Sequence, residues 1–226
     1  KPSGIVHALA LAGSTLFAGG EFGQIAGKSR SYLAAFDTAT GQITDWKPEP
    51  NSKVTALLCD GQTLYVGGSF LYIADQDLNV LAAFNAATGS LLPWDAKFAG
   101  LIYNVYCMAM SDTTLYINGT FTSVAGKTRN GLAAIDRATA QVTDWNPGFD
   151  KTIATLALCG PQVYAAGFFT SVSGQARAGL AAVDAQTGSL KAWNPGLTSP
   201  GWSNSIPTMA SDGSRVYLGG AYMVTG

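Results

Sequence analysis

Charged residues are scarce in this 226-residue chain. Lys, Arg, Asp and Glu make up 12% of the residues and leave a formal net charge of −1, whereas apolar residues reach 47%. Such a composition favours a large buried core and excludes disorder. Because the chain has no surplus of Lys and Arg, it lacks a basic surface for phosphate groups, and we expect neither nucleic acid nor an anionic membrane as a partner.

Long apolar runs and paired cysteines are also missing. No apolar segment approaches the roughly 18 residues that a membrane-spanning helix needs, so no membrane insertion is expected. The three cysteines, Cys59, Cys107 and Cys159, lie in or just after the first expected strand of separate repeats. This odd set does not form a disulfide framework, and we interpret the cysteines as buried free thiols.

Side chains for catalysis or metal binding are few. His7 is the only histidine, which leaves no second imidazole for a zinc site, and we interpret it as an interior or channel-lining residue. Most carboxylates recur at turn or loop positions, and the sequence shows no pair facing across a cleft, as a glycosidase needs. We therefore predict no catalytic residue, no metal site and no cofactor.

What the chain does contain is a repeat. A Val or Ile precedes a Gly by fourteen positions five times, and the first four of these glycines precede a Trp by 26 positions. The units open at Val6, Val54, Val105, Ile153 and Ile206. Only the joint from each Trp to the next unit changes, with lengths of 8, 11, 8 and 13 positions. The constant spacing indicates that most residues serve to form the fold. The joints of variable length are therefore the candidates for a functional role.

Each unit has the periodicity of β-strands. In the first unit, residues 6–11 and 16–19 predict one hairpin, and residues 32–36 and 42–46 predict a second one across the turn Asp-Thr-Ala-Thr-Gly. The continuous apolar run at 33–36 indicates a strand that is covered on both faces. Four short strands recurring every 48 to 53 residues are typical of the blades of a β-propeller.

The repeat predicts an all-β chain with a single β-propeller domain over residues 1–226. We expect four complete four-stranded antiparallel blades and the first hairpin of a fifth, at residues 5–53, 54–104, 105–152, 153–205 and 206–226. Four and a half blades expose the faces of the terminal sheets. We therefore expect either that the chain is part of a longer propeller of six to eight blades, or that copies or other protein chains cover its ends.

Two other recurrent features are interpreted as structural. The Trp that ends each unit is large enough to fill the gap between the outer strands of neighbouring blades. In three repeats an Arg precedes an Asp by seven positions, and in the second repeat both are absent: the pairs are Arg30 with Asp37, Arg129 with Asp136 and Arg177 with Asp184, and the replacements are Leu78 and Asn85. Because the Arg and the Asp are lost together in the second repeat, we predict that they form a half-buried ion pair in the other repeats. The alternative is that these residues bind a ligand.

The strings LAAFDTATG at 33–41, LYVGGSF at 64–70 and LAAVDAQTG at 180–188 resemble the secreted bacterial β-propeller repeats called delta-sixty repeats. The Gly-Gly pair is also similar to kelch repeats, and Asp-x-x-Thr-Gly before a Trp is similar to quinoprotein propellers. The resemblance covers nearly the whole chain. It implies a propeller, often in exported or cell-surface proteins, and it carries over no catalytic residue.

The loops that cross from one blade to the next are the expected binding surface, because only their lengths vary. They carry Phe98, Tyr103, Phe149 and Trp202. Exposed rings at these positions are suited to stacking on a glycan or anchoring a protein partner; alternatively, they cap the apolar ends of the blades.

The leading hypothesis is a non-enzymatic, exported propeller that serves as a structural or protein-binding module in a cell-surface or multi-protein assembly. The rival hypothesis is a carbohydrate-active or quinoprotein-like enzyme with a site on the loop face or in the central channel.

Overall fold

The computed structural model describes residues 1–98, 104–198, 205–221 and 223–224, and these form strands, turns and loops. The chain divides into two compact units, Lys1–Tyr106 and Cys107–Gly226. No helix in the described ranges is long and apolar enough to cross a lipid bilayer. The all-β prediction is confirmed, and each unit is described by itself below.

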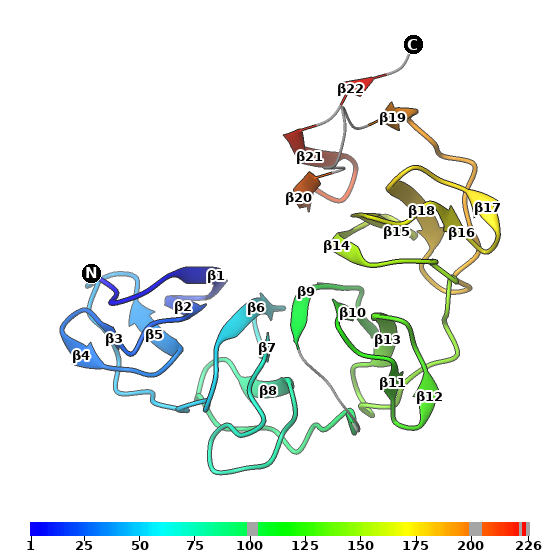
Figure 1. The fold of residues 1–226 in the computed structure, drawn as a ribbon. Helices are drawn as coiled ribbons and strands as arrows, with labels where there is room; N and C mark the ends of the chain where they lie inside the picture. Colours follow the sequence, from blue (N-terminus) through cyan, green and yellow to red (C-terminus); the bar gives the residue numbers. More distant parts are fainter. Residues whose placement is uncertain (99–103, 199–204, 222, 225–226) are drawn as a thin grey trace. The chain divides into compact units, whose positions relative to one another are not determined.

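The first unit contains two antiparallel sheets whose strands follow one another in chain order (Figure 1). One sheet is β1 (Val6–Ala12), β2 (Thr15–Gly20) and β5 (Leu33–Asp37), and the other is β6 (Val54–Cys59), β7 (Thr63–Gly68) and β8 (Leu81–Asn85). A small hairpin, β3 (Gln24–Ile25) and β4 (Lys28–Ser29), projects between β2 and β5. The predicted first hairpin is thus confirmed.

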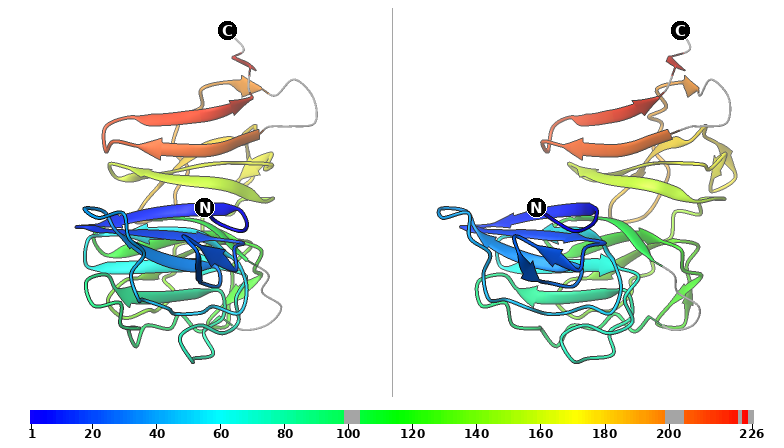
Figure 2. Two further views of the ribbon diagram at one scale, coloured as in Figure 1. Left: turned by 90° about the vertical axis from the view of Figure 1, so that its left-hand side faces the viewer. Right: turned by 60° about the vertical axis from the view of Figure 1, so that its left-hand side comes forward.

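The second unit repeats this arrangement. Its sheets are β9 (Val105–Met110), β10 (Thr114–Gly119) and β13 (Leu132–Asp136), then β14 (Ile153–Cys159), β15 (Gln162–Gly167) and β18 (Leu180–Asp184), then the hairpin β20 (Ser205–Ser211) and β21 (Val216–Ala221). Short pairs are β11 (Ser123–Val124) with β12 (Lys127–Thr128), β16 (Ser171–Val172) with β17 (Gln175–Ala176), and β19 (Leu197–Thr198) with β22 (Met223–Val224). In both views of Figure 2, β14 and the β20–β21 hairpin lie as successive layers, as their contacts require.

The predicted fourth strand is shorter than expected. In the first sheet it is reduced to a bridge between Phe36 and Ile43, and the same single bridge recurs in three further sheets. Two hydrogen bonds flank it, including one from the Thr44 amide to the Ala35 carbonyl (2.8 Å). After this bridge the Trp46 amide bonds to the Thr44 hydroxyl (3.4 Å), and the fourth segment pairs no further in any of the four sheets.

Neighbouring sheets within a unit pack face to face. In the first unit, Phe17 and Ala35 of one sheet meet Leu64, Val66 and Phe84 of the next in a single apolar cluster. In the second unit the equivalent cluster joins residues of β10 and β13 to residues of β14, β15 and β18. Burial on both faces explains the continuous apolar runs of the third strands.

A Trp closes the outer part of each such junction. The Trp46 ring lies edge-on between Phe17 (5.2 Å between centroids) of its own sheet and Phe84 (5.4 Å) of the next. Its indole N–H donates to the Gly89 carbonyl (2.8 Å). Trp145 repeats this role in the second unit, where its indole N–H donates to the Asp184 carbonyl (2.9 Å). The Trp residues therefore fill the gap between sheets, as their size indicates.

The predicted Arg–Asp ion pair is wrong. The Arg129 guanidinium is buried and donates to the carbonyls of Thr128 (2.7 Å) and Thr143 (2.6 Å). The Asp136 carboxylate instead accepts the amide and the hydroxyl of Thr139 (both 2.8 Å) and closes the next turn. Arg30 and Asp37 repeat both arrangements, and Asp184 pairs with Lys191 (2.7 Å) rather than with Arg177.

The joint absence in the second repeat has two separate causes. Asn85 keeps the turn, because its Oδ1 accepts the amides of Ala87 (3.0 Å) and Thr88 (2.9 Å). Leu78 is buried and belongs to the apolar cluster between the sheets. Each replacement meets a local requirement, so neither depends on the other.

Candidate functional site

At one end of three of the described sheets, hydrogen bonds join the loop that enters the sheet to the loop between its second and third strands. In the first unit, the Asn51 Oδ1 accepts the backbone amides of Leu71 (2.9 Å) and Tyr72 (3.2 Å). One repeat earlier, the Ser3 hydroxyl oxygen accepts the amide of Gly23 (3.0 Å). These bonds satisfy loop amides that no strand pairs, and they fix the loops relative to the sheets.

Asp150 fastens the corresponding loops of the second unit. Its Oδ1 accepts the amides of Thr170 (2.9 Å) and Ser171 (3.0 Å), and its Oδ2 accepts the Thr170 hydroxyl (2.6 Å). The Thr170 hydroxyl is the main cause that lowers the pKa of Asp150, and the Ser171 amide adds to it. The carboxylate is therefore ionised at neutral pH and serves as a fixed hydrogen-bond acceptor.

These fastened loops expose large apolar side chains. Leu71 is 54% exposed and Phe168 is 53% exposed, and Tyr72 is exposed beside Leu71. At the position of Leu71 the other repeats have Gly23, Thr122 and Thr170, and at the position of Phe168 they have Glu21, Ser69 and Thr120. The sequence analysis missed these apolar residues. The signal that identifies them is an apolar side chain at a loop position where the other repeats have glycine or a polar residue.

The structure places two of the four predicted aromatics inside the fold. Phe98 and Phe149 are both buried. The Phe149 ring lies edge-on to Phe169, with 4.7 Å between the centroids. These two residues fill the space beneath the loops, as the capping alternative proposes, because the loops that carry them lie against neighbouring apolar side chains. Tyr103 and Trp202 lie outside the described residues.

A polar cluster lies beside β1 in the first unit. The Glu21 Oε1 is 3.1 Å from the His7 Nε2 and 3.1 Å from the Lys53 Nζ. The hydrogen bonds with His7 and then with Lys53 lower the pKa of Glu21. Glu21 is therefore an ionised acceptor for two basic side chains rather than a proton donor. His7 is exposed at the register shift between β1 and β2, which excludes the interior position and leaves the channel-lining position as the prediction.

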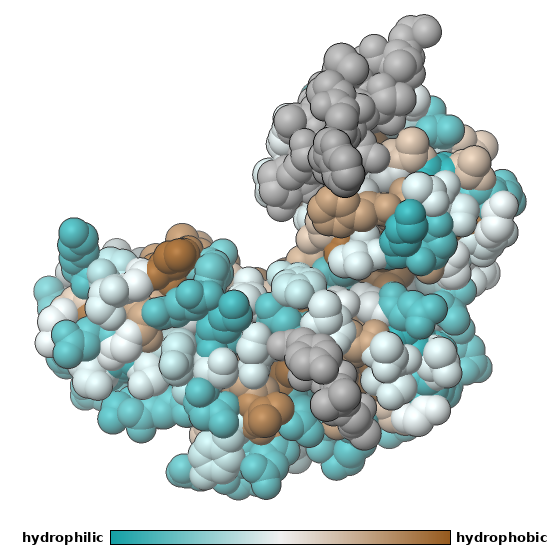
Figure 3. Space-filling view, viewed as in Figure 1, coloured by the Kyte–Doolittle hydropathy of each residue, from teal (hydrophilic) through white to brown (hydrophobic). Residues whose placement is uncertain are grey.

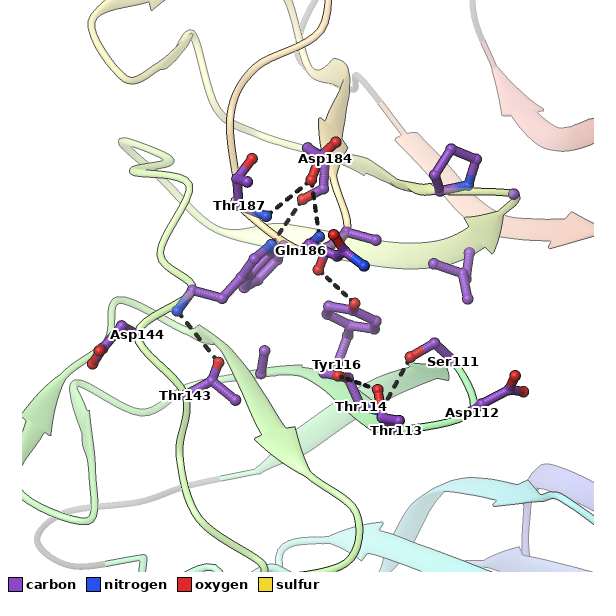
Figure 4. A pocket seen from close by; sticks show the side chains of 16 residues that line it. Ser111, Asp112, Thr113, Thr114, Tyr116, Thr143, Asp144, Asp184, Gln186 and Thr187 are labelled. Atoms are coloured by element: carbon purple, nitrogen blue, oxygen red, sulfur yellow. Dashed lines mark hydrogen bonds between the residues drawn. The ribbon is translucent and has the colours of Figure 1, made fainter.

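The second unit contains a groove of about 740 Å³ (Figure 4). Tyr116 and Trp145 line its inner part, where the Tyr116 hydroxyl donates to the Ala185 carbonyl (2.7 Å). Both rings are buried, so they offer little surface to a ligand. The remaining lining is mostly hydroxyl, amide and carboxylate side chains: Ser111, Asp112, Thr113, Thr114, Thr143, Asp144, Gln186, Thr187 and Asp184.

Two carboxylates of this groove are neutralised by neighbouring lysines. Asp144 lies 2.6 Å from the Lys127 Nζ, and this hydrogen bond is the main cause that lowers the pKa of Asp144. The hydrogen bond from Lys191 is likewise the main cause that lowers the pKa of Asp184, and the backbone amides of the turn lower it further. A general acid requires a raised pKa, so these groups act as hydrogen-bond acceptors. Within the ranges that the structure describes, no three His, Cys, Asp or Glu side chains form a group suited to a metal ion.

Solved structures resemble this fold at low sequence identity. The extracellular domain of the one-component system BT4673 from B. thetaiotaomicron is 15% identical over 95% of this chain and 25% of that one, with a TM-score of 0.58. A chain of the mitotic checkpoint complex is 14% identical over 84% and 51%, with a TM-score of 0.56. The computationally designed protein Ika4 is 17% identical over 74% and 88%, with a TM-score of 0.52. These likenesses support the fold alone.

Sequence comparison assigns the family. No curated protein matches the chain. The family described as outer membrane protein assembly factor BamB matches residues 66–224, which is more than half of the chain. The repeated antiparallel sheets, which pack face to face within each unit, are the blades of a propeller. The chain is therefore a β-propeller that belongs to the family of outer membrane protein assembly factor BamB.

Proposed function

We propose that this chain is a non-enzymatic propeller module that binds protein partners through the loop end of its sheets, within an exported or cell-surface assembly. The observation that carries this proposal is the exposure of Leu71, Tyr72 and Phe168 on loops that hydrogen bonds already fix. Apolar side chains on ordered loops contribute buried area on binding and lose little conformational entropy.

The family supports an assembly role. Its description names an assembly factor of outer membrane proteins, and the resemblance to delta-sixty repeats points to export as well. The near-zero net charge of this chain favours a partner that is recognised through apolar contacts rather than through phosphate groups. Tyr103 and Trp202 stay predicted partner contacts because of their positions in the crossing loops, whereas Phe98 and Phe149 are buried and support these loops from beneath.

The rival enzymatic function has weaker support in the groove of the second unit. Acid–base hydrolysis needs one carboxyl group that is protonated near neutral pH. Asp144 and Asp184 have lowered pKa values because lysine side chains bind them. Their geometry favours hydrogen bonding to a polar partner over proton transfer.

Site-specific photo-crosslinking tests the proposal in the cells that produce the protein. Benzoylphenylalanine replaces Leu71 or Phe168, and matched controls carry it at Ala87 and Gln186, exposed positions in the turns at the opposite end of the same sheets. We expect each loop position to give a crosslink to a protein that the control positions do not capture, identified by mass spectrometry. Equal yields at the control positions, or no protein crosslinked at either loop position, would overturn the proposal.

The affinity of single-residue variants for the purified partner is then measured. Leu71→Asp places a charge in the proposed contact, and we expect it to weaken binding about tenfold or more, as loss of an interface anchor does. Ala87→Asp is the control and leaves the affinity unchanged.

A further inference from the structure

The loop between β7 and β8 combines exposed apolar side chains with exposed carboxylates. Leu71 and Tyr72 are exposed, and Asn51 fixes the backbone at both residues. Asp75 and Asp77 follow within the same loop and are exposed as well. Figure 3 shows hydrophobic and hydrophilic side chains next to one another along the lower edge of the first unit, where this loop lies in Figure 1. We call Leu71, Tyr72, Asp75 and Asp77 the mixed patch.

The charge of this loop is opposite to that of its counterparts in the other complete repeats. Residues 73–78 contain two Asp and no Lys or Arg. Residues 25–30 and 124–129 each contain one Lys and one Arg, residues 172–177 contain one Arg, and none of these three segments contains an acidic residue. The repeated fold therefore does not require carboxylates here, and among the four complete repeats they are particular to the second.

The two carboxylates are not neutralised by basic side chains. Among the residues that the structure describes, neither Asp75 nor Asp77 forms an ion pair. The Asp75 Oδ1 accepts the Tyr72 hydroxyl (3.2 Å). Desolvation, this hydrogen bond and the charges of Asp75 and Asp77 raise the pKa of Tyr72, so both carboxylates lie near the phenol. A cation over the exposed Tyr72 ring is attracted by the ring face and by these two charges together.

The backbone at Asp75 adds a separate observation. Its φ is 61°, in the left-handed region that glycine adopts without steric cost. The equivalent residues of the other complete repeats are all glycine, with similar φ values: Gly27 (77°), Gly126 (76°) and Gly174 (75°). The exposed bond from Tyr72 offsets little of this cost, since water can replace it. Folding alone thus favours glycine at this position, and the carboxylate indicates a role in recognition.

We propose that the mixed patch receives an arginine of the protein partner, together with a large apolar side chain next to it in the partner's sequence. This inference rests on the proposed function and specifies the chemistry of its partner. The guanidinium stacks on the Tyr72 ring and donates to the carboxylates of Asp75 and Asp77. The apolar side chain packs on Leu71. Arginine fits better than lysine, because its planar group can stack on a ring and bond to two carboxylates at once.

Crosslinking from benzoylphenylalanine at Leu71 tests this contact when it is repeated with altered carboxylates. Asp75→Gly and Asp77→Ser each restore the residue of the first repeat, so both variants are expected to fold. We expect either change to lower the crosslink yield about fivefold or more, because the guanidinium loses a charged acceptor. Asp75→Gly is also expected to raise the thermal unfolding midpoint, because glycine relieves the left-handed backbone. A structural role for Asp75 predicts the opposite shift.

The matched control is Asp112→Gly. Asp112 is another exposed carboxylate at a position where the other repeats have glycine, and it lies in the second unit, on the turn between β9 and β10. We expect this variant to leave the yield at Leu71 unchanged. The crosslinked peptide of the partner, sequenced by mass spectrometry, is expected to contain an arginine, and its replacement by alanine should lower the yield as Asp77→Ser does.

The outcomes separate this inference from the proposed function. No crosslink at either Leu71 or Phe168 would overturn the proposed function and this inference with it. The arginine contact alone is overturned, and partner binding stands, in any of four cases: Phe168 crosslinks but Leu71 does not; the Leu71 crosslink survives both carboxylate changes; it falls equally with Asp112→Gly; or it maps to a segment without arginine. A lower unfolding midpoint for Asp75→Gly would likewise assign Asp75 to the fold and overturn its role in recognition.

Discussion

At the scale of single residues, Asp150 shows how one carboxylate orders a loop. It accepts two backbone amides through one oxygen and a hydroxyl through the other. Asn51 makes the same pair of backbone bonds with a neutral amide oxygen. The geometry therefore requires an acceptor at this position, and the charge adds only a dependence on pH.

Replacement of Asp150 separates these two contributions. We expect Asp150→Asn to keep the amides of Thr170 and Ser171 protected from hydrogen exchange, because Asn51 performs the same task, and Asp150→Ala to lose that protection. The folded pKa of Asp150 is lowered, so the native protection is present above the ordinary carboxyl pKa of 3.8 and is lost as the pH falls through the lowered value. Exchange rates corrected for intrinsic pH effects measure this. An Asp150→Ala variant as protected as the native chain would contradict the assignment.

At the scale of elements, the Gly-Gly pair near the end of the second strand, present in β2, β7 and β21, sets how the inner strands fit together. The pairing of β1 with β2 shifts register between Val6 and Ala8. A methyl group on Gly20 would overlap the backbone oxygen of Ile5, which has no room to move, whereas one on Gly19 would meet the Val54 side chain of the next sheet. In β15 the first position is Ala166 and the second is still Gly167.

This difference predicts unequal effects of the same substitution. Gly19→Ala should lower the free energy of unfolding by about 1 kcal/mol, because the Val54 side chain can adjust. Gly20→Ala should lower it by about 3 kcal/mol, because the obstacle is backbone. Urea denaturation of the two variants measures both values. The explanation fails if Gly20→Ala is the better tolerated of the two.

At the scale of the whole molecule, stability resides in junctions between successive sheets. One apolar cluster joins successive sheets in the first compact unit and another joins successive sheets in the second. In repeat architectures of this kind, each repeat gains stability chiefly from its neighbours along the chain. A defect in one junction should therefore remain local.

Trp145→Ala tests this expectation. Loss of the ring beside Tyr116 and of the indole bond to Asp184 should cost about 3–5 kcal/mol. We expect faster amide exchange in β10, β13, β15 and β18, with β1 and β2 unchanged. Trp46→Ala is the matched variant and should give the reverse pattern in the first unit. Exchange that rises equally in both units after either substitution would show a single cooperative core instead.

Much of the fold was predictable, because its signals are local. The hairpins follow from apolar runs separated by turn residues, as between β1 and β2, and the blade architecture follows from their even recurrence. The fourth strand was overestimated, since polar and apolar residues alternate at 42–44 as in a strand but only one bridge forms in each of the four sheets. The Arg–Asp interpretation failed because recurrence at a fixed spacing does not reveal which acceptor a long side chain reaches.

The candidate surfaces depended more on contacts between distant segments. Chain position places Phe98 and Phe149 on crossing loops, yet packing against other loops buries them, while Leu71 and Phe168 remain exposed. The repeated pattern of residues suffices to define strands, turns and the chemistry of each face, because these depend on near neighbours in the chain. Whether a face is a core or a surface depends on the next sheet: Leu156 is buried because Tyr116 and Ala134 of the preceding sheet pack against it.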